Sequence, residues 1–105
     1  MNNCVFTGYL YDDPEVEIHE DSGAEYCEFT VYVHEYFRNK RGEKKRASTY
    51  LRFIAWDSGA RTIAKLGREG MKITINASAK NLEPECDTEV IFRVNQFDFG
   101  CLDKE

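Results

Sequence analysis

The chain has 105 residues, of which 42% are hydrophobic and 13% aromatic, so it suits one globular domain and leaves no room for a second. Its formal net charge of −5, taken alone, argues against a nucleic-acid-binding protein. No apolar run approaches the roughly 20 residues of a membrane helix, and the first residues lack a signal-peptide pattern. We therefore expect a cytoplasmic protein with no membrane partner.

Four cysteines stand at positions 4, 27, 86 and 101, and their spacing matches no zinc motif. In a reducing compartment they are expected to be free thiols. Cys4 and Cys27 could still face each other across neighbouring strands.

The charge is distributed unevenly along the chain. Residues 1–35 contain nine acidic residues and no lysine or arginine. Residues 36–52 contain seven basic residues against Glu43 alone, a net charge of +6. A polyanionic partner responds to this local concentration rather than to the sum, so the basic segment is a candidate binding region.

The first half of the chain predicts three strands. Residues 4–10 form the first, which the Asp-Asp-Pro sequence at 12–14 ends. Apolar residues at every second position predict a long, half-buried strand over 26–34. Residues 39–46 are polar and charged and predict a loop or hairpin tip, and residues 48–56 form the third strand.

The second half predicts one helix and two strands. Residues 58–66 carry an apolar stripe at helical spacing, with Ser58 as the N-cap and two glycines after the end. Residues 71–79 and 90–94 alternate as strands, and the proline-containing segment 83–87 connects them.

This order of elements is typical of the OB-fold, an all-β, five-stranded barrel with one short helix between strands 3 and 4. A small barrel needs small side chains where its wall bends, and Gly8, Ala77 and Ala79 suit that role. We assign residues 1–100 to this domain and residues 101–105 to a C-terminal end.

Several stretches of the chain resemble, in the same order, the bacterial and phage single-stranded DNA-binding proteins. They are NNCVFTGYLYDDPEVE, SGAEYCEFTVYV, FRNKRGE, YLRFIAW and GARTIAKLGREGMKITI, and the resemblance runs from Met1 to about Phe99. It implies an OB-fold that binds single-stranded DNA during DNA replication, recombination or repair. It also implies a homo-oligomer, a tetramer or else a dimer, with other replication proteins as possible partners.

The chain departs from that family in two regions. The connection NLEPECD is short and carries no stacking ring, and only Lys80 lies near it. Cellular members end in an acidic tip with a terminal Phe, whereas this sequence ends in CLDKE. That ending fits a tailless viral member or a truncated chain.

Sequence-tolerant binding of an unpaired strand needs cations along a groove and flat rings on which bases stack. Both residue types interleave in the basic segment and the strand after it. The candidate DNA-binding residues are Tyr36, Phe37, Arg38, Lys40, Arg41, Lys44, Lys45, Arg46, Tyr50, Arg52, Trp56 and Lys80. No nucleophile, phosphate-loop or metal motif is present, so we predict no enzyme activity, no cofactor and no metal site.

The resemblance implies roles for some of these residues. Three rings match the family's stacking positions, namely Phe37, Tyr50 and Trp56. Arg52 matches a phosphate-contacting arginine, and Lys40 matches a basic residue of the hairpin. Whether Tyr36 or Phe37 is the main stacking ring stays open, and Trp56 could instead belong to the core at the barrel end.

Alternation divides the third strand into two faces. Leu51, Phe53 and Ala55 are predicted to fill the barrel, and the residues between them to face the DNA. Two rival functions stay open: a primosome-type OB protein that bridges replication proteins, and a protein–protein module that uses the same rings. The affinity for oligonucleotides of varied length would separate the bridging protein from a single-stranded DNA-binding protein. The protein–protein module would show no salt-sensitive DNA binding.

Overall fold

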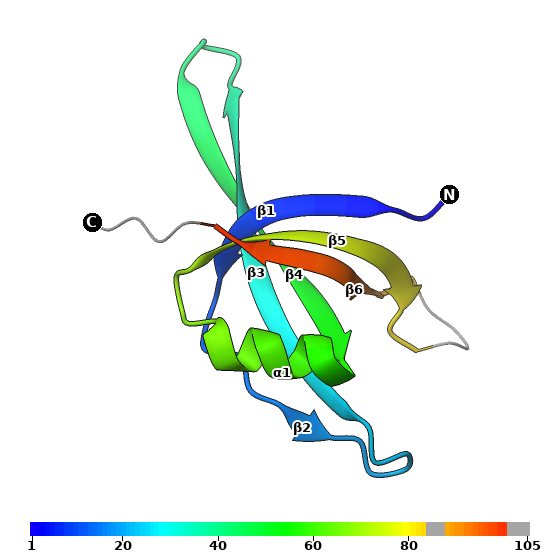
Figure 1. Cartoon of the computed structure of the whole chain (residues 1–105). Helices are drawn as coiled ribbons and strands as arrows, with labels where there is room; N and C mark the ends of the chain where they lie inside the picture. Colours follow the sequence, from blue (N-terminus) through cyan, green and yellow to red (C-terminus); the bar gives the residue numbers. More distant parts are fainter. Residues whose placement is uncertain (84–87, 101–105) are drawn as a thin grey trace.

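Six strands and one helix form the described part of the protein; the computed structural model describes residues 1–83 and 88–100. The elements are β1 (Cys4–Leu10), β2 (Glu17–Ile18), β3 (Glu25–Arg38), β4 (Lys44–Trp56), α1 (Asp57–Leu66), β5 (Lys72–Asn81) and β6 (Val90–Phe99). The strands lie in one sheet in the order β1-β5-β6-β4-β3-β2, and β4 pairs with β6 in parallel. A further pairing between β1 and β3 closes the five long strands into a barrel (Figure 1).

The predicted five-stranded OB-fold barrel is confirmed, with one change in its numbering. The sequence places the helix between strands 3 and 4, whereas α1 lies between β4 and β5. The difference arises because the two-residue strand β2 pairs with the start of β3 and adds one strand to the count. Relative to the five long strands, the helix lies where it is expected.

The barrel closes where β1 changes partners. β1 pairs with β5 from Cys4 to Tyr9 and with β3 at Tyr9 and Leu10. Gly8 lies at this crossing, and a Cβ atom there would sit 2.4 Å from the backbone oxygen of Tyr32. Any larger residue would push β3 away, so the absence of a side chain at Gly8 permits the closure.

Apolar residues at alternating positions of the strands fill the barrel. The buried ones are Leu10, Cys27, Phe29, Val31, Phe53, Ala55, Ile73, Ile75, Ala77 and Ile91. Phe53 is fully buried, and its ring stacks on that of Phe29 with the centroids 5.6 Å apart. Tyr50, on the other face of β4, is 59% exposed. The predicted division of this strand between core and outer face is therefore correct for Phe53, Ala55 and Tyr50.

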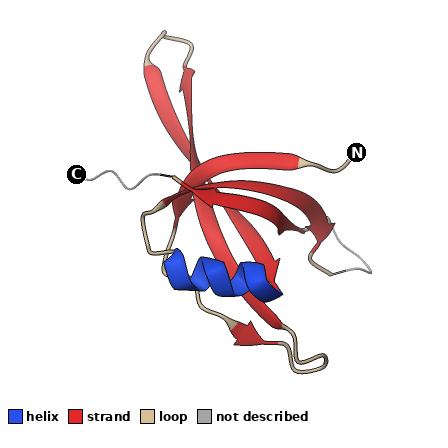
Figure 2. Ribbon diagram, viewed as in Figure 1, coloured by secondary structure: helices blue, strands red, loops and turns tan. Residues whose placement is uncertain are grey.

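Helix α1 packs against β3 and β4 and buries Ala60 and Ile63 (Figure 2). The predicted cap is wrong: the helix begins at Asp57, and the N-cap residue Trp56 makes no side-chain hydrogen bond. The chain turns directly at Asp57, which has a φ of 56°, so Ser58 already lies inside the first turn. The carboxylate of Asp57 takes a favourable place near the positive end of the helix dipole.

Beyond the barrel, β3 and β4 continue as a projecting two-stranded hairpin (Figure 2). Residues 39–46 are predicted as a loop or hairpin tip; they do lie at a hairpin tip, but the pairing continues as far as Arg38 opposite Lys44. The turn is tight because Oδ1 of Asn39 accepts hydrogen bonds from two backbone N–H groups, at 2.9 and 3.0 Å. The loop prediction is therefore wrong for residues 44–46, which belong to β4.

The two described cysteines are free and do not face each other. Cys4 lies opposite Ala77, and Cys27 lies opposite Ala55. Burial raises the pKa of the Cys27 thiol to about 11. The cysteines at positions 86 and 101, most of the 83–87 connection and the 101–105 end lie outside the described residues. Within residues 1–83 and 88–100, no helix is long and apolar enough to cross a membrane.

Candidate nucleic-acid interface

Strands β3 and β4 share one continuous outer face, from the hairpin tip to the far end of the barrel. Side chains alternate along each strand and the two strands are in register, so the residues of this face form cross-strand pairs. From the tip the pairs are Arg38–Lys44, Tyr36–Arg46, His34–Ser48, Tyr32–Tyr50, Thr30–Arg52, Glu28–Ile54 and Tyr26–Trp56. Seven of the twelve candidate residues belong to these pairs.

Four tyrosines and a histidine meet at the middle of this face. This tyrosine cluster consists of Tyr9, Tyr11, Tyr32, His34 and Tyr50. The ring centroid of Tyr32 lies 5.6 Å from that of Tyr9 and 5.8 Å from that of Tyr50. Tyr11 meets Tyr50 edge to face at 5.8 Å, and Tyr50 and Tyr11 are 59% and 55% exposed. The cluster leaves two rings open to bases, supported by the others behind and beside them.

A groove of about 450 Å³ runs beside the tyrosine cluster. It is lined by Leu10, Tyr11, Tyr32, His34, Arg46, Ser48, Tyr50, Glu69 and Gly70. Arg46 comes from the hairpin and Glu69 from the turn between α1 and β5, so the groove carries both a cation and a carboxylate. Nδ1 of His34 and Oγ of Ser48 are 2.9 Å apart, which fixes the imidazole within the groove wall.

The hairpin tip concentrates positive charge. Lys44 lies over the ring of Tyr36, with its Nζ atom 5.4 Å from the centroid. The guanidinium of Arg38 donates a hydrogen bond to the backbone oxygen of Gly42 at 2.8 Å. In the described part of the chain the one ion pair at the tip joins Lys45 to Glu43, at 3.7 Å, so the other cations of the tip stay available to phosphates.

The structure separates the remaining candidates from this face. Phe37 and Lys45 pair with each other on the opposite side of the hairpin, where Phe37 is 51% exposed. Lys40 and Arg41 lie in the turn itself. Lys80 lies on β5 opposite Ile91 and belongs to another part of the barrel wall. The candidate set is therefore not one patch.

Trp56 lies at the other end of the outer face. It is half-buried, and its ring contacts Tyr26 at 5.5 Å and His19 at 5.9 Å. The hydroxyl of Tyr26 donates to Oε1 of Glu17 at 3.0 Å, and this hydrogen bond is the main cause that raises the pKa of Tyr26. Trp56 is thus a partly covered surface ring rather than a core residue.

Between the two groups of rings, Arg52 forms an ion pair with Glu28 across the strands, at 3.2 Å. Both side chains are about half exposed, with 52% and 44% of their surface accessible. Exposed pairs of this kind contribute about 0–1 kcal/mol. The guanidinium can therefore exchange the carboxylate for a DNA phosphate at little cost in stability.

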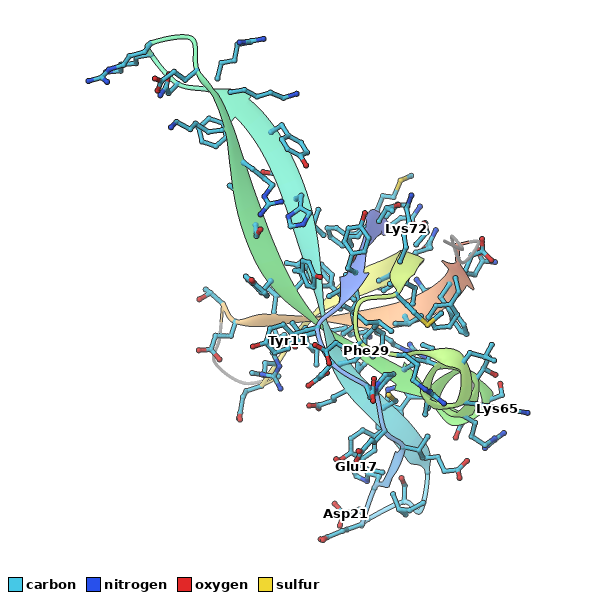
Figure 3. The ribbon with its side chains drawn as sticks, turned by 90° about the vertical axis from the view of Figure 1, so that its left-hand side faces the viewer. Tyr11, Glu17, Asp21, Phe29, Lys65 and Lys72 are labelled. Atoms are coloured by element: carbon cyan, nitrogen blue, oxygen red, sulfur yellow. The ribbon has the colours of Figure 1, made fainter. Side chains whose placement is uncertain are left out.

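The far end of the molecule is acidic. Figure 3 shows Glu17 and Asp21 at the end opposite the hairpin, beside the turn between β2 and β3. The basic tip and this acidic end give the protein a strong charge asymmetry along its length. A polyanion is accordingly directed to the hairpin side.

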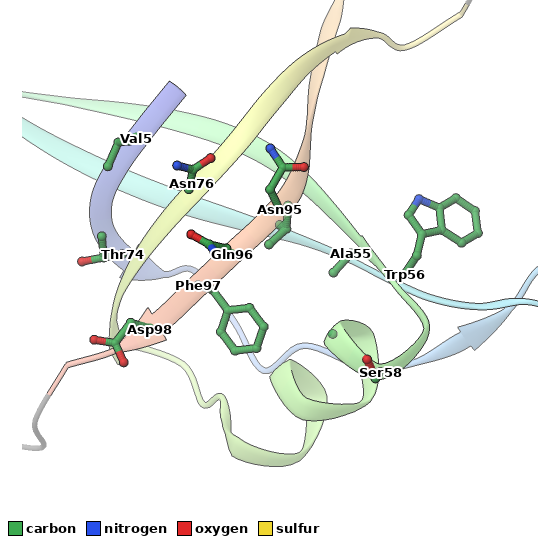
Figure 4. A pocket seen from close by; sticks show the side chains of 12 residues that line it. Val5, Ala55, Trp56, Ser58, Thr74, Asn76, Asn95, Gln96, Phe97 and Asp98 are labelled. Atoms are coloured by element: carbon green, nitrogen blue, oxygen red, sulfur yellow. The ribbon is translucent and has the colours of Figure 1, made fainter. Parts of the chain in front are cut away.

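A larger hollow, of about 720 Å³, lies elsewhere, beside β5, β6 and the start of α1 (Figure 4). Polar uncharged side chains such as Thr74, Asn76 and Gln96 line it, and Asp98 is the one charged residue among those that do. A surface with a carboxylate and no cation does not attract a phosphate backbone. We therefore place the candidate interface on β3 and β4.

Sequence patterns did not single out several residues of the interface. Tyr9 lies on β1, Tyr11 directly follows that strand, and Tyr32 and His34 lie on the outer face of β3. Their alternation with apolar residues is visible in the sequence, but it does not show that β1 and β3 meet at this point. Glu69 had no sequence signal, because its place in the groove depends on how the turn before β5 folds back on β1.

The model of the family described as "Single-strand binding protein family" matches residues 1–93. The chain belongs to the single-strand binding protein family. No curated protein sequence matches the chain.

Solved structures of similar fold include proteins described as single-stranded DNA-binding proteins. One is a single-stranded DNA-binding protein from Thermus aquaticus, a deletion mutant, with a TM-score of 0.80 and 18% identity over 94% of this chain. The wild-type protein from the same organism gives a TM-score of 0.77 and 16% identity. In both cases the match covers 50% of the other chain, so this chain spans half the length of those proteins. The Plasmodium falciparum SSB in complex with ssDNA has a TM-score of 0.73 and 24% identity, and the match covers 98% of this chain and 96% of the Plasmodium chain.

Proposed function

We propose that this member of the family binds single-stranded DNA along the outer face of β3 and β4, with little dependence on base sequence. One observation carries the proposal: rings and cations alternate along a single face, from Arg38 and Lys44 at the tip to Trp56. Exposed rings stack on any base, and cations pair with phosphates of any sequence. Arg46 and Arg52 flank the tyrosine cluster, so phosphates can be held while bases reach Tyr50.

The experiment is a titration of the protein with single-stranded DNA, followed through the fluorescence of Trp56. Unlabelled single-stranded and duplex DNA then compete against a bound oligonucleotide. We expect the single strand to compete far better, because the bases of a duplex are stacked on each other and cannot reach the rings. Equal competition by the duplex would contradict the proposal.

We propose further that the protein works as an oligomer of identical chains, a tetramer or else a dimer. A chain of charge −5 that gathers its positive charge in one hairpin gains by placing several hairpins around one strand. Light scattering at micromolar concentration is expected to give a multiple of the 12.2 kDa chain mass. A particle of the single-chain mass would contradict this.

The wider role that we propose is protection of unpaired DNA in the cytoplasm during replication, recombination or repair, without a catalytic step. The rings and cations along the outer face of β3 and β4 support this role. The same titration with oligonucleotides of increasing length separates this role from a bridging role between replication proteins, because a protective protein gains affinity as the strand reaches more of the face.

A further inference from the structure

We infer that the groove beside the tyrosine cluster is a nucleobase subsite in which the carboxylate of Glu69 selects guanine over thymine. This inference rests on the proposed function, because it assigns one nucleotide of the bound strand to one place on the binding face. It adds a base preference at a single position to a face that is otherwise indifferent to sequence.

The turn between α1 and β5, which carries Glu69 at the side of the groove, is fixed by hydrogen bonds to the end of β1 and the segment after it. The backbone N–H of Glu69 donates to Oδ1 of Asp13 at 2.7 Å. The next residue, Gly70, donates its N–H to the backbone oxygen of Leu10 at 2.9 Å, and Leu10 donates to the oxygen of Met71 at 2.9 Å. Gly70 has a φ of 85°, a conformation that favours glycine. The turn is thus fastened to β1, next to Tyr11, which fixes the backbone of Glu69 at the edge of the groove.

The carboxylate itself has no ion pair or hydrogen bond within residues 1–83 and 88–100. Arg46 lines the same groove but forms no ion pair with Glu69. The groove therefore offers a free cation from the hairpin and a free carboxylate from the turn, with exposed rings between them. A phosphate is attracted to the Arg46 side and repelled from the Glu69 side.

What reaches Glu69 must consequently be a base rather than the backbone. A base stacked on the exposed ring of Tyr50 can turn its Watson–Crick edge toward the carboxylate, and the groove volume of about 450 Å³ leaves room for it. An ionised carboxylate only accepts hydrogen bonds. It therefore favours edges that donate and disfavours edges that carry carbonyl oxygens.

The four bases differ in this respect. Guanine presents two neighbouring donors, N1–H and the 2-amino group, which match both oxygens of a carboxylate. Cytosine and adenine each offer one amino group, while thymine offers a single N–H between two carbonyl oxygens. The expected order at this position is guanine first, cytosine and adenine next, and thymine last.

The test uses three single strands of equal length: all thymine, alternating thymine and guanine, and alternating thymine and inosine, which is guanine without the 2-amino group. The wild-type protein should bind the guanine strand at least about fivefold more tightly than the thymine strand, with the inosine strand between them. Glu69→Gln keeps the shape but replaces one of the two acceptor oxygens with an amide NH2 donor. It can no longer accept from both guanine donors through two oxygens, so the ratio of the guanine to the thymine affinity should fall close to one.

The matched control is Glu20→Gln, which removes the same charge from an exposed residue of the turn before β3, at the acidic end. It should leave the ratio as in the wild type. The ratio cancels the general gain in affinity that follows from losing a negative charge. The same ratio in the wild type and in Glu69→Gln, or no preference in the wild type, would overturn the inference; wild-type protein that binds none of the three strands would overturn the proposed function instead.

Discussion

The β3–β4 ribbon has two halves with the same alternation of side chains but different burial: one half belongs to the barrel and the other projects from it. In the barrel half, Phe29 and Phe53 point inward and are buried, and their neighbours point outward. In the projecting half, the strands keep the same register, but no barrel covers the inner side, so Tyr36 and Phe37 are both exposed on opposite faces. Alternation therefore separates core from surface only where something lies on one side of the ribbon.

The largest effect expected from this comparison concerns stability. Phe53→Ala should lower the free energy of unfolding by about 3–5 kcal/mol, because it leaves a cavity in the core. Phe37→Ala, the same change in the projecting half, should stay within about 0.5 kcal/mol. Urea unfolding followed by circular dichroism measures both. A large loss in Phe37→Ala would show that the projecting half is covered in solution, for instance by another copy of the chain.

The next effect concerns the outer face of the barrel half. Tyr50→Ala should weaken single-stranded DNA binding about 5- to 150-fold, since stacking contributes about 1–3 kcal/mol per ring. The exposed position of Tyr50 should keep the free energy of unfolding nearly unchanged. Tyr50→Phe keeps the ring and is the control, with affinity close to that of the wild type. An equal loss in Tyr50→Phe would assign the effect to the hydroxyl rather than to stacking.

The third prediction asks which face of the projecting half the DNA follows. Tyr36 lies on the same face as Tyr50, and Phe37 does not. If the strand stays on one face, Tyr36→Ala weakens binding several-fold more than Phe37→Ala, as fluorescence titrations of both variants would show. We expect this result. The reverse order would mean that the DNA crosses to the back of the hairpin, where resemblance to the family places the stacking ring.

The smallest effect concerns the salt dependence of binding. Each phosphate contact on a single strand contributes about −0.7 to the slope of log affinity against log salt. Replacing Lys44 and Arg46 by Ala together should flatten the slope by about 1.4, because both lie on the outer face. Lys45→Ala should change it little, since Lys45 lies on the other face beside Glu43. Equal changes per residue would show that the hairpin inserts between DNA segments.

The candidate interface could be predicted only in part, and the residues show why. The sequence placed Tyr50, Arg52 and Trp56 correctly on one face, because they lie close together on one strand, where period-two alternation fixes their common side. Phe37 and Lys45 were grouped with them because proximity in sequence does not say which side of an uncovered hairpin a residue takes. Lys80 was included for its charge, although its strand pairs elsewhere.

By itself, the sequence determined the helix, the five long strands in their main parts and the OB-fold, because alternation of apolar residues, turn residues and helical spacing are local properties of the chain. It missed the short strand β2 and the start of β4. It also determined the concentration of charge in residues 36–52. Only the tertiary structure decided that Tyr9 and Tyr11 join Tyr32 and Tyr50, because that contact depends on the pairing of β1 with β3 where Gly8 permits closure. The position of Glu69 in the groove has the same origin: it follows from hydrogen bonds between segments more than fifty residues apart, and no local pattern records them.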